Sequence, residues 1–342
     1  RYSTLNLHRE FPVVRVFTDT MKKKRDAIRI FGNYGFNAHE FEDELTPILK
    51  FGSEFNIPKY SWLSCECNMS ATQDTKFEEE YVGNPNTFNT HDELAPQFSI
   101  FSYDLETNSS NPKKIPIAAI KDNYIAMASI TYTYKDIYKE YVLILNVDIR
   151  DIYDRYSKTE IESGIVTIYV AKNELDLIMR FFNYIDELDP DVITGHNIMG
   201  FDNPFIIERH SFLVKLALAS DPSLSVKIPN ISRLKNSCCP IQNVKWNNSQ
   251  VSMSGSYIVM HGRIWIDSLC VIARGLFGQM PDGKLNTLAR EHLSMEKDDV
   301  EASDMFKAFQ LFQDYLLSEN PTYPYRDNLY KNITNEYIKL VK

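Results

Sequence analysis

Apolar runs dominate the chain from residue 98 onward, and they predict a sheet followed by helices. Four runs rich in β-branched and aromatic residues predict strands over residues 98–106, 124–134, 140–148 and 164–170. After them, apolar residues recur at helical spacing over residues 173–188, where Asn173 is a suitable N-cap.

The pattern continues with a short strand that leads into a loop over residues 189–197, and with a helix over 201–218 that has Pro204 in its first turn. This order of strands and helices is typical of an α/β domain with a mixed sheet. Residues 218–250 are polar and predict an insertion over the surface. Residues 256–269 return to strand, and most of the remainder has helical character.

The first hundred residues have a weaker pattern of short strands and one helix over residues 24–35. Residues 78–97 are polar, contain Asn, Pro and Gly, and predict a linker. We therefore expect two domains, a smaller mixed α/β domain over residues 1–97 and a larger one over 98–342.

Composition narrows the class of protein. The chain has 342 residues and a net charge of −9, which argues against a module that grips duplex DNA by its phosphates. No apolar run reaches the ~18 residues of a membrane helix, and no signal peptide is readable. An odd, low cysteine count suits a reducing, intracellular setting, and the spacing favours free thiols over zinc ligands. The cysteines are Cys65, Cys67, Cys238, Cys239 and Cys270.

The first candidate chemistry is a pair of acids inside an apolar strand. Asp104 and Glu106 are two residues apart, so a strand places both on one face, with Leu105 on the other. Two such close carboxylates repel each other unless a cation lies between them. Oxygen ligands suit hard divalent ions such as Mg²⁺, although a D-x-E pair alone is often an exposed salt-bridge partner.

A second candidate group follows the short strand, in "GHNIMGFDNPFI". Asp202 opens a helix there, where it is either a further metal ligand or a helix cap. Asn197 either contacts a substrate or holds the loop in an Asx turn. Asp267 also ends a strand, and we interpret it as the cap of the following helix.

Together these segments resemble the exonuclease region of the family-B DNA polymerases, especially the delta-like and large-DNA-virus members. "FSYDLET" resembles the first exonuclease motif and "GHNIMGFDNPFI" the second. "GRIWIDSLCVIAR" and "KLNTLAREHLSMEKDDV" resemble the stretch that follows, and "ILKFGSEFNIPKYSWLSC" the end of the N-terminal domain. The resemblance covers most of the chain from about residue 45.

The resemblance implies a ribonuclease H-like fold and a 3′→5′ proofreading exonuclease that uses two Mg²⁺ or Mn²⁺ ions. It implies that Asp104 bridges the ions, while Glu106 and Asp202 each help to hold one. Thr107 and Asn197 would lie against the terminal nucleotides, with Phe201 packed beside them. The implied partners are the single-stranded 3′ end of a DNA primer, the rest of a polymerase chain and replication accessory proteins, with no membrane.

The third motif of the family, Y-x-x-x-D on a helix, has no convincing match. "YTYKD" at 132–136 lies in a strand, and "YPYRD" at 323–327 contains a proline. We therefore expect a piece of a DNA-directed DNA polymerase that stops short of this motif and is weak or inactive as a nuclease alone. It would act in replication, in a nucleus or at a viral replication site. The alternatives are an inactive scaffold that guides single-stranded DNA and a free-standing exonuclease of the same class.

Overall fold

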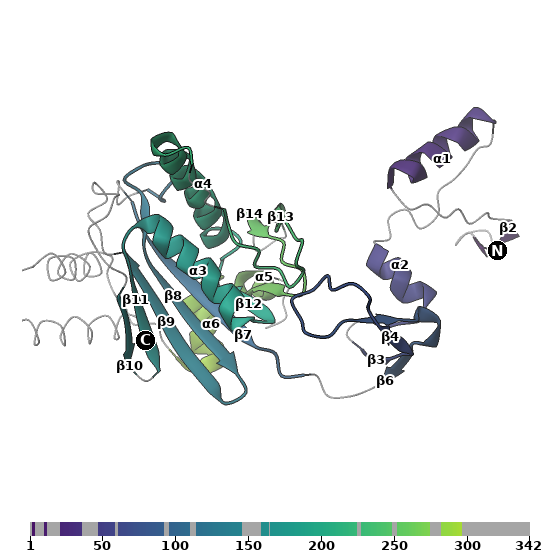
Figure 1. Ribbon diagram of the computed structural model, residues 1–342, viewed down its shortest axis with the longest axis horizontal. Coiled ribbons are helices and arrows are strands. Elements are labelled where there is room, and N and C mark those ends of the chain that lie inside the picture. Colours follow the sequence, from purple (N-terminus) through teal and green to yellow (C-terminus); the bar gives the residue numbers. More distant parts are fainter. Residues whose placement is uncertain are drawn as a thin grey trace, which may run out of the picture. The chain divides into compact units, whose positions relative to one another are not determined.

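The computed structural model forms two compact units, shown in Figure 1. Unit 1 comprises residues 1–68 and 82–94, and unit 2 comprises 69–81 and 95–342. The structure describes residues 2–3, 10–11, 21–35, 47–58, 61–91, 96–109, 114–145, 159–163, 165–223, 227–247, 252–273 and 282–295. The strands predicted before residue 20 lie mostly outside these residues. The helices predicted after residue 300 and the whole of "YPYRD" at 323–327 also lie outside them.

Unit 1 consists of short elements. Its helices are α1 (Met21–Asn33), which confirms the predicted helix, α2 (Pro47–Glu54) and the 3-10 turn η1 (Pro85–Thr87). Its strand pairs are β1 (Tyr2–Ser3) with β2 (Glu10–Phe11), and β3 (Trp62–Ser64) with β6 (Asn89–His91). A further pair joins β4 (Cys67–Met69) to β5 (Tyr81–Gly83).

The linker predicted over residues 78–97 is wrong in its first part, because β5, η1 and β6 occupy it. The ring of Phe88 lies 6.1 Å from that of Phe51 and 6.3 Å from that of Phe55. Through these aromatic contacts Phe88 packs the polar stretch against α2 and the residue that follows it, so the stretch is part of unit 1.

Unit 2 is built on a seven-stranded sheet with the order β10-β11-β9-β8-β7-β12-β15. The strands are β7 (Ile100–Asn108), β8 (Tyr124–Tyr134), β9 (Ile137–Leu145), β10 (Thr159–Ser163), β11 (Val166–Ala171), β12 (Val192–Gly195) and β15 (Ile264–Asp267). β7, β8 and β9 form an antiparallel meander, whereas β11 joins β9, and β12 joins both β7 and β15, in parallel. This confirms the predicted mixed sheet; the sequence pattern missed only the short edge strand β10.

Two long helices, α3 (Glu174–Leu188) and α4 (Asp202–Ser220), pack against each other, and α3 lies across β8, β9 and β11 (Figure 1). As predicted, Asn173 caps α3 by accepting a hydrogen bond from the backbone N–H of Asp176. The ring of Phe181 lies 5.0 Å from that of Tyr103 and 5.9 Å from that of Phe101, so α3 seals the face of β7 opposite Asp104.

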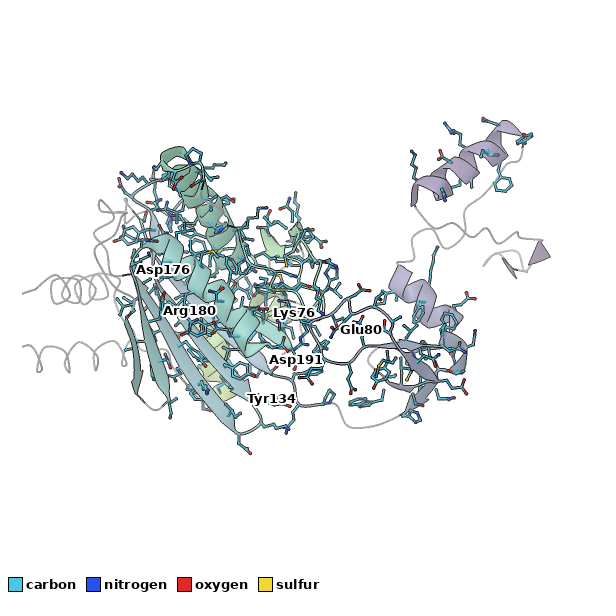
Figure 2. The ribbon with its side chains drawn as sticks, viewed as in Figure 1. Lys76, Glu80, Tyr134, Asp176, Arg180 and Asp191 are labelled. Atoms are coloured by element: carbon cyan, nitrogen blue, oxygen red, sulfur yellow. The ribbon has the colours of Figure 1, made fainter. Side chains whose placement is uncertain are left out.

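Polar side chains also join α3 to the sheet. Figure 2 labels Asp176 and Arg180 on this helix. Asp176 accepts a hydrogen bond of 3.0 Å from the hydroxyl of Tyr169 on β11. The guanidinium of Arg180 lies 4.0 Å from the ring centre of Tyr184 and 5.4 Å from that of Tyr169. These contacts fix the orientation of α3 on the strand beneath it.

Residues 69–81 belong to unit 2 although they lie between two parts of unit 1 in sequence. The backbone N–H of Lys76 donates to the carbonyl of Arg233 at 2.8 Å, and Lys235 N–H donates to the carbonyl of Asp74 at 2.8 Å. Figure 2 labels Lys76, whose ammonium pairs with Asp186 at the end of α3. Glu80, also labelled, stiffens the segment by accepting the backbone N–H of Asp74.

The insertion predicted over residues 218–250 is only partly a surface feature. Ile231 and Ser232 are fully buried, and Arg233 pairs with Asp189 and Asp191 at 2.9 Å each. Its last part forms β13 (Ile241–Asn247), which pairs with β14 (Ser252–Ile258) in a hairpin. The single strand predicted over 256–269 is therefore wrong: it is divided between β14 and β15 at a turn where Gly262 has a φ of 84°.

The chain then continues into α5 (Ser268–Ala273) and α6 (Leu285–Leu293), which lies within a stretch predicted to be helical. None of the five cysteines, all of which lie within the described residues, forms a disulfide. Among the residues described, no helix is long and apolar enough to cross a membrane.

Candidate functional site

The candidate site is built around β7, whose side chains alternate strictly. Phe101, Tyr103 and Leu105 are buried beneath α3, whereas Asp104 is exposed on the other face. Glu106 follows on the face of Asp104 and is partly exposed, as the D-x-E spacing predicts. A β-bulge separates Glu106 from Thr107, which is also partly exposed.

Beyond Ser102, no strand in the part of the chain that the structure describes pairs with the edge of β7 that faces β12, because β12 ends at Gly195. The loop after β12 fills this place, and it passes close to the strand: a Cβ on Gly195 would lie 2.6 Å from the carbonyl oxygen of Tyr103. Glycine at 195 therefore allows the second motif to approach the first.

Asp202 is the first residue of α4 and is only 3% exposed. Its Oδ1 accepts a hydrogen bond of 3.0 Å from the backbone N–H of Leu105. The N-cap of α4 is Phe201, which has no side-chain cap hydrogen bond. The carboxylate of Asp202 is thus hydrogen-bonded to the backbone of Leu105, the residue next to Asp104.

The charges at this point are in conflict. Burial, together with the nearby carboxylates of Asp104 and Asp267, raises the pKa of Asp202 to about 8, although the Leu105 hydrogen bond acts to lower it. Burial and the same three acids also raise the pKa of Tyr103 well above its ordinary value. Without a cation, the structure therefore disfavours an ionised Asp202.

Replacing Asp202 with asparagine is therefore expected to stabilise the protein in the presence of EDTA. Between the unfolded pKa of ~3.9 and the folded value of about 8, only the unfolded state releases this proton, so the wild type loses stability as pH rises. The gain of Asp202→Asn should grow through this window and reach about 2 to 5 kcal/mol at pH 8. Urea unfolding at pH 4, 6 and 8 measures it.

Asp136→Asn, at an exposed turn position after β8, is the control and should show no such gain. A gain in stability for Asp202→Asn that does not change with pH would show that the ionised Asp202 carboxylate is not disfavoured in the folded protein.

Asp267 organises the loop before Asp202. It is 2% exposed, and its two oxygens accept the backbone N–H groups of Asn197, Met199 and Leu269, each at 2.9 Å. The bond to Leu269 confirms the predicted cap of α5. The two bonds to the loop were missed, and the signal for them was that Gly195 and Asp267 end neighbouring parallel strands.

The remaining candidates line the same loop. Asn197 has a left-handed backbone with a φ of 60°, and its side chain is partly exposed. His196 hydrogen-bonds with the hydroxyl of Ser268 and with the carbonyl of Gly283. The ring of Phe201 stacks on that of Phe205 at 5.7 Å and remains partly exposed. The roles of Asn197, Phe201 and Thr107 toward a nucleotide stay predictions.

A divalent cation suits the chemistry of this site only in part. Asp104 and Asp202 are close enough to repel, and both offer the oxygen ligands that Mg²⁺ prefers. Asp267 uses its oxygens on N–H groups. Among the residues described, however, no three histidine, cysteine or acidic side chains gather as a metal-binding group, so Asp104, Glu106 and Asp202 do not form one here.

The β13–β14 hairpin presses on the loop from another side. A Cβ on Gly255 would clash with the backbone of Met199, which leaves room only for glycine. Gly255→Ala should therefore displace the loop and cost about 1 to 3 kcal/mol of stability, as overpacking usually does. Urea unfolding measures the loss. Gly32→Ala in α1, where a Cβ meets nothing within 4 Å, is the control; an equally small effect of both changes would contradict the close contact.

Comparisons with known proteins show which family the sequence matches. Residues 38–288 match the family described as DNA polymerase family B, exonuclease domain. A DNA polymerase of Invertebrate iridescent virus 3 is 24% identical over 89% of this chain and 27% of its own length. The DNA polymerase delta catalytic subunit of Caenorhabditis elegans is 32% identical over 38% of this chain and 11% of its own length. The chain thus spans about a quarter or less of these relatives.

The family B DNA polymerase from the archaeon Pyrobaculum calidifontis has a similar structure, with a TM-score of 0.54 and 14% identity. The match covers 92% of this chain and 33% of the archaeal one. This likeness concerns the fold, and it confirms the predicted α/β class, a ribonuclease H-like domain with a mixed sheet and flanking helices.

Proposed function

The chain belongs to the exonuclease-domain family of the family-B DNA polymerases, and from this premise we propose that it removes nucleotides from the 3′ end of DNA. Residues 98–342 carry this activity, and residues 1–97 form the preceding N-terminal domain, apart from the segment 69–81 that folds with the exonuclease unit. The reaction is hydrolysis of the terminal phosphodiester, with release of a nucleoside monophosphate.

One observation carries the proposal: Asp202 accepts the backbone N–H of Leu105, the residue between Asp104 and Glu106. Two acids that are 98 positions apart in sequence therefore meet at the end of β12. A surface salt bridge does not require this, because Asp202 is almost fully buried. The repulsion between the two carboxylates favours binding of a cation.

Asp104, Glu106 and Asp202 would hold Mg²⁺ or Mn²⁺, as two ions. Such ions, when bound, activate water and stabilise the negative charge that develops on a phosphate under attack. The chain's own part is to fix the acids: the sheet holds Asp104 and Glu106, and the Leu105 bond holds Asp202. Glu106 would be the further carboxylate available to such ions.

The substrate is a single-stranded 3′ end. A chain with a net charge of −9 has no strong general attraction for duplex phosphates, so recognition depends on local contacts. Thr107, Asn197 and the partly exposed ring of Phe201 are the groups available for the terminal nucleotides. Stacking on an aromatic ring tolerates any base, which suits an enzyme that removes nucleotides regardless of sequence. The rest of a polymerase chain and replication accessory proteins are the further partners.

The test is release of nucleotides from single-stranded DNA labelled at its 3′ end, with Mg²⁺ or Mn²⁺ and with EDTA. We expect mononucleotides as the first products, dependent on the cation, even if the rate is low. The same strand labelled at its 5′ end should shorten one nucleotide at a time. Internal cleavage, or activity that EDTA leaves intact, would contradict the proposal.

A further inference from the structure

The residues on both sides of Asp104 are tied to the first turn of α4. Leu105 donates its backbone N–H to Asp202, and the hydroxyl of Tyr103 donates a hydrogen bond of 2.6 Å to Oδ1 of Asn203. Two consecutive residues of the helix therefore bind the two residues that flank the exposed acid. Beyond Ser102, no strand among the described residues pairs with this edge of β7, so these two bonds join the strand to α4 where strand pairing has ended.

The Tyr103–Asn203 bond is held rigidly. Tyr103 is 4% exposed, and its ring lies 5.0 Å from Phe181 and 6.5 Å from Trp265, each nearly edge-on. Asn203 is 3% exposed in the first turn of α4. Aromatic packing on two sides leaves the hydroxyl one direction, toward the helix.

The Tyr103–Asn203 pair is less stabilising than an apolar pair would be at the same place in the core. The side-chain Nδ2 of Asn203 is buried and has no hydrogen-bond partner among the described residues. A buried polar atom without a partner costs stability, whereas an apolar pair of similar shape, such as phenylalanine and leucine, avoids that cost. Stability therefore does not explain the polar pair. The pair does add a directional hydrogen bond at Asn203, next to Asp202, whose position relative to Asp104 matters for the site.

We propose that Tyr103 and Asn203 are positioning residues that set the separation between Asp104 and Asp202. The inference rests on the proposed function for its consequence, cation binding by the acids, but the positioning itself is a property of the fold. Without the Tyr103 bond, the first turn of α4 moves relative to β7, and the Leu105–Asp202 bond opens more often.

Three variants of the 342-residue chain separate positioning from stability. Tyr103→Phe removes only the hydroxyl, and the double variant Tyr103→Phe with Asn203→Leu replaces both partners by apolar groups. Tyr169→Phe is the matched control, since it removes another buried hydroxyl of the same sheet, bonded to Asp176 far from the acids in sequence. We expect the double variant to unfold at nearly the wild-type urea concentration, because both polar groups are gone.

The first readout is hydrogen exchange of the Leu105 amide, which needs no metal. We expect it to be about tenfold faster in Tyr103→Phe and in the double variant, but unchanged in Tyr169→Phe. The second readout is Mn²⁺ binding by calorimetry, expected to be about tenfold weaker in the double variant despite its recovered stability.

Unchanged exchange at Leu105 in the double variant would overturn the inference, as would wild-type Mn²⁺ affinity in that variant. If the wild type binds Mn²⁺ no better than Asp104→Ala, the proposed function fails instead, and the exchange of Leu105 still decides the positioning role.

Discussion

Replacing Asp104 with alanine is expected to lower the cation-dependent release of nucleotides from a single-stranded 3′ end by about 100-fold or more. Asp104 is the exposed acid of β7, and its charge acts on Asp202. Its removal takes away one of the carboxylates that would hold the cations. The fold should be intact, because the side chain does not belong to the buried face of the strand.

The control is Asp136→Ala, which removes another exposed acid from the turn after β8 in "YTYKD". It should keep wild-type activity, since this match to Y-x-x-x-D lies in a strand and turn rather than a helix. In a longer polymerase that carries this chain, Asp104→Ala should leave nucleotide incorporation unchanged. Equal loss of both activities would indicate a structural role for Asp104.

Replacing Arg209 with methionine is expected to produce the largest loss of stability in unit 2, about 3 to 5 kcal/mol. The guanidinium is 1% exposed and bonds to both carboxylate oxygens of Glu174 at 2.8 to 2.9 Å. It also donates to the carbonyls of Ala118, Ile120 and Lys121. The variant leaves a buried carboxylate without its cation and these carbonyls without their donor.

Glu174 has a second partner, the backbone N–H of Ile125 at the start of β8, so the cluster joins α3, α4 and the sheet. Burial raises the pKa of Glu174, and Arg209 opposes the rise. Urea unfolding measures the loss, with Glu187→Gln as the control. That change breaks the Arg180–Glu187 pair, whose glutamate is half exposed, and should cost less than about 1 kcal/mol. A similar cost for both variants would show that the buried cluster does not hold the unit together.

The sheet and its helices were predictable because their side chains are sorted by period. β8 occupies the predicted residues, and α3 begins after the predicted cap Asn173. Here burial follows hydrophobicity, so the pattern along the chain reports the fold directly.

The prediction failed where folding depends on polar contacts between distant residues. Ser232 is fully buried in a stretch that reads as a surface insertion, and its Oγ accepts the backbone N–H of His261. Arg233 is held by Asp189 and Asp191, more than 40 positions away. No local period marks such bonds, because each partner looks like an ordinary surface residue in sequence.

The candidate site divides in the same way. Asp104, Glu106 and Asp202 could be proposed from residue type and spacing in two motifs. The roles of Asp267 and Asn203 could not, because both depend on which strands and helices become neighbours. The side chains proposed to act on a substrate can be identified from the sequence, whereas those that hold them in place can be identified only from the structure.

The most direct test of the central claim is to locate manganese in crystals of the 342-residue chain soaked with Mn²⁺ and a short single-stranded oligonucleotide. Anomalous diffraction identifies the ions without assumptions about their ligands. The account predicts manganese at about 2 Å from carboxylate oxygens of Asp104 and Asp202, with Glu106 as a further ligand, and none there in Asp104→Ala. Manganese bound only elsewhere, with Asp202 still bonded to Leu105 and no ion beside it, would contradict it.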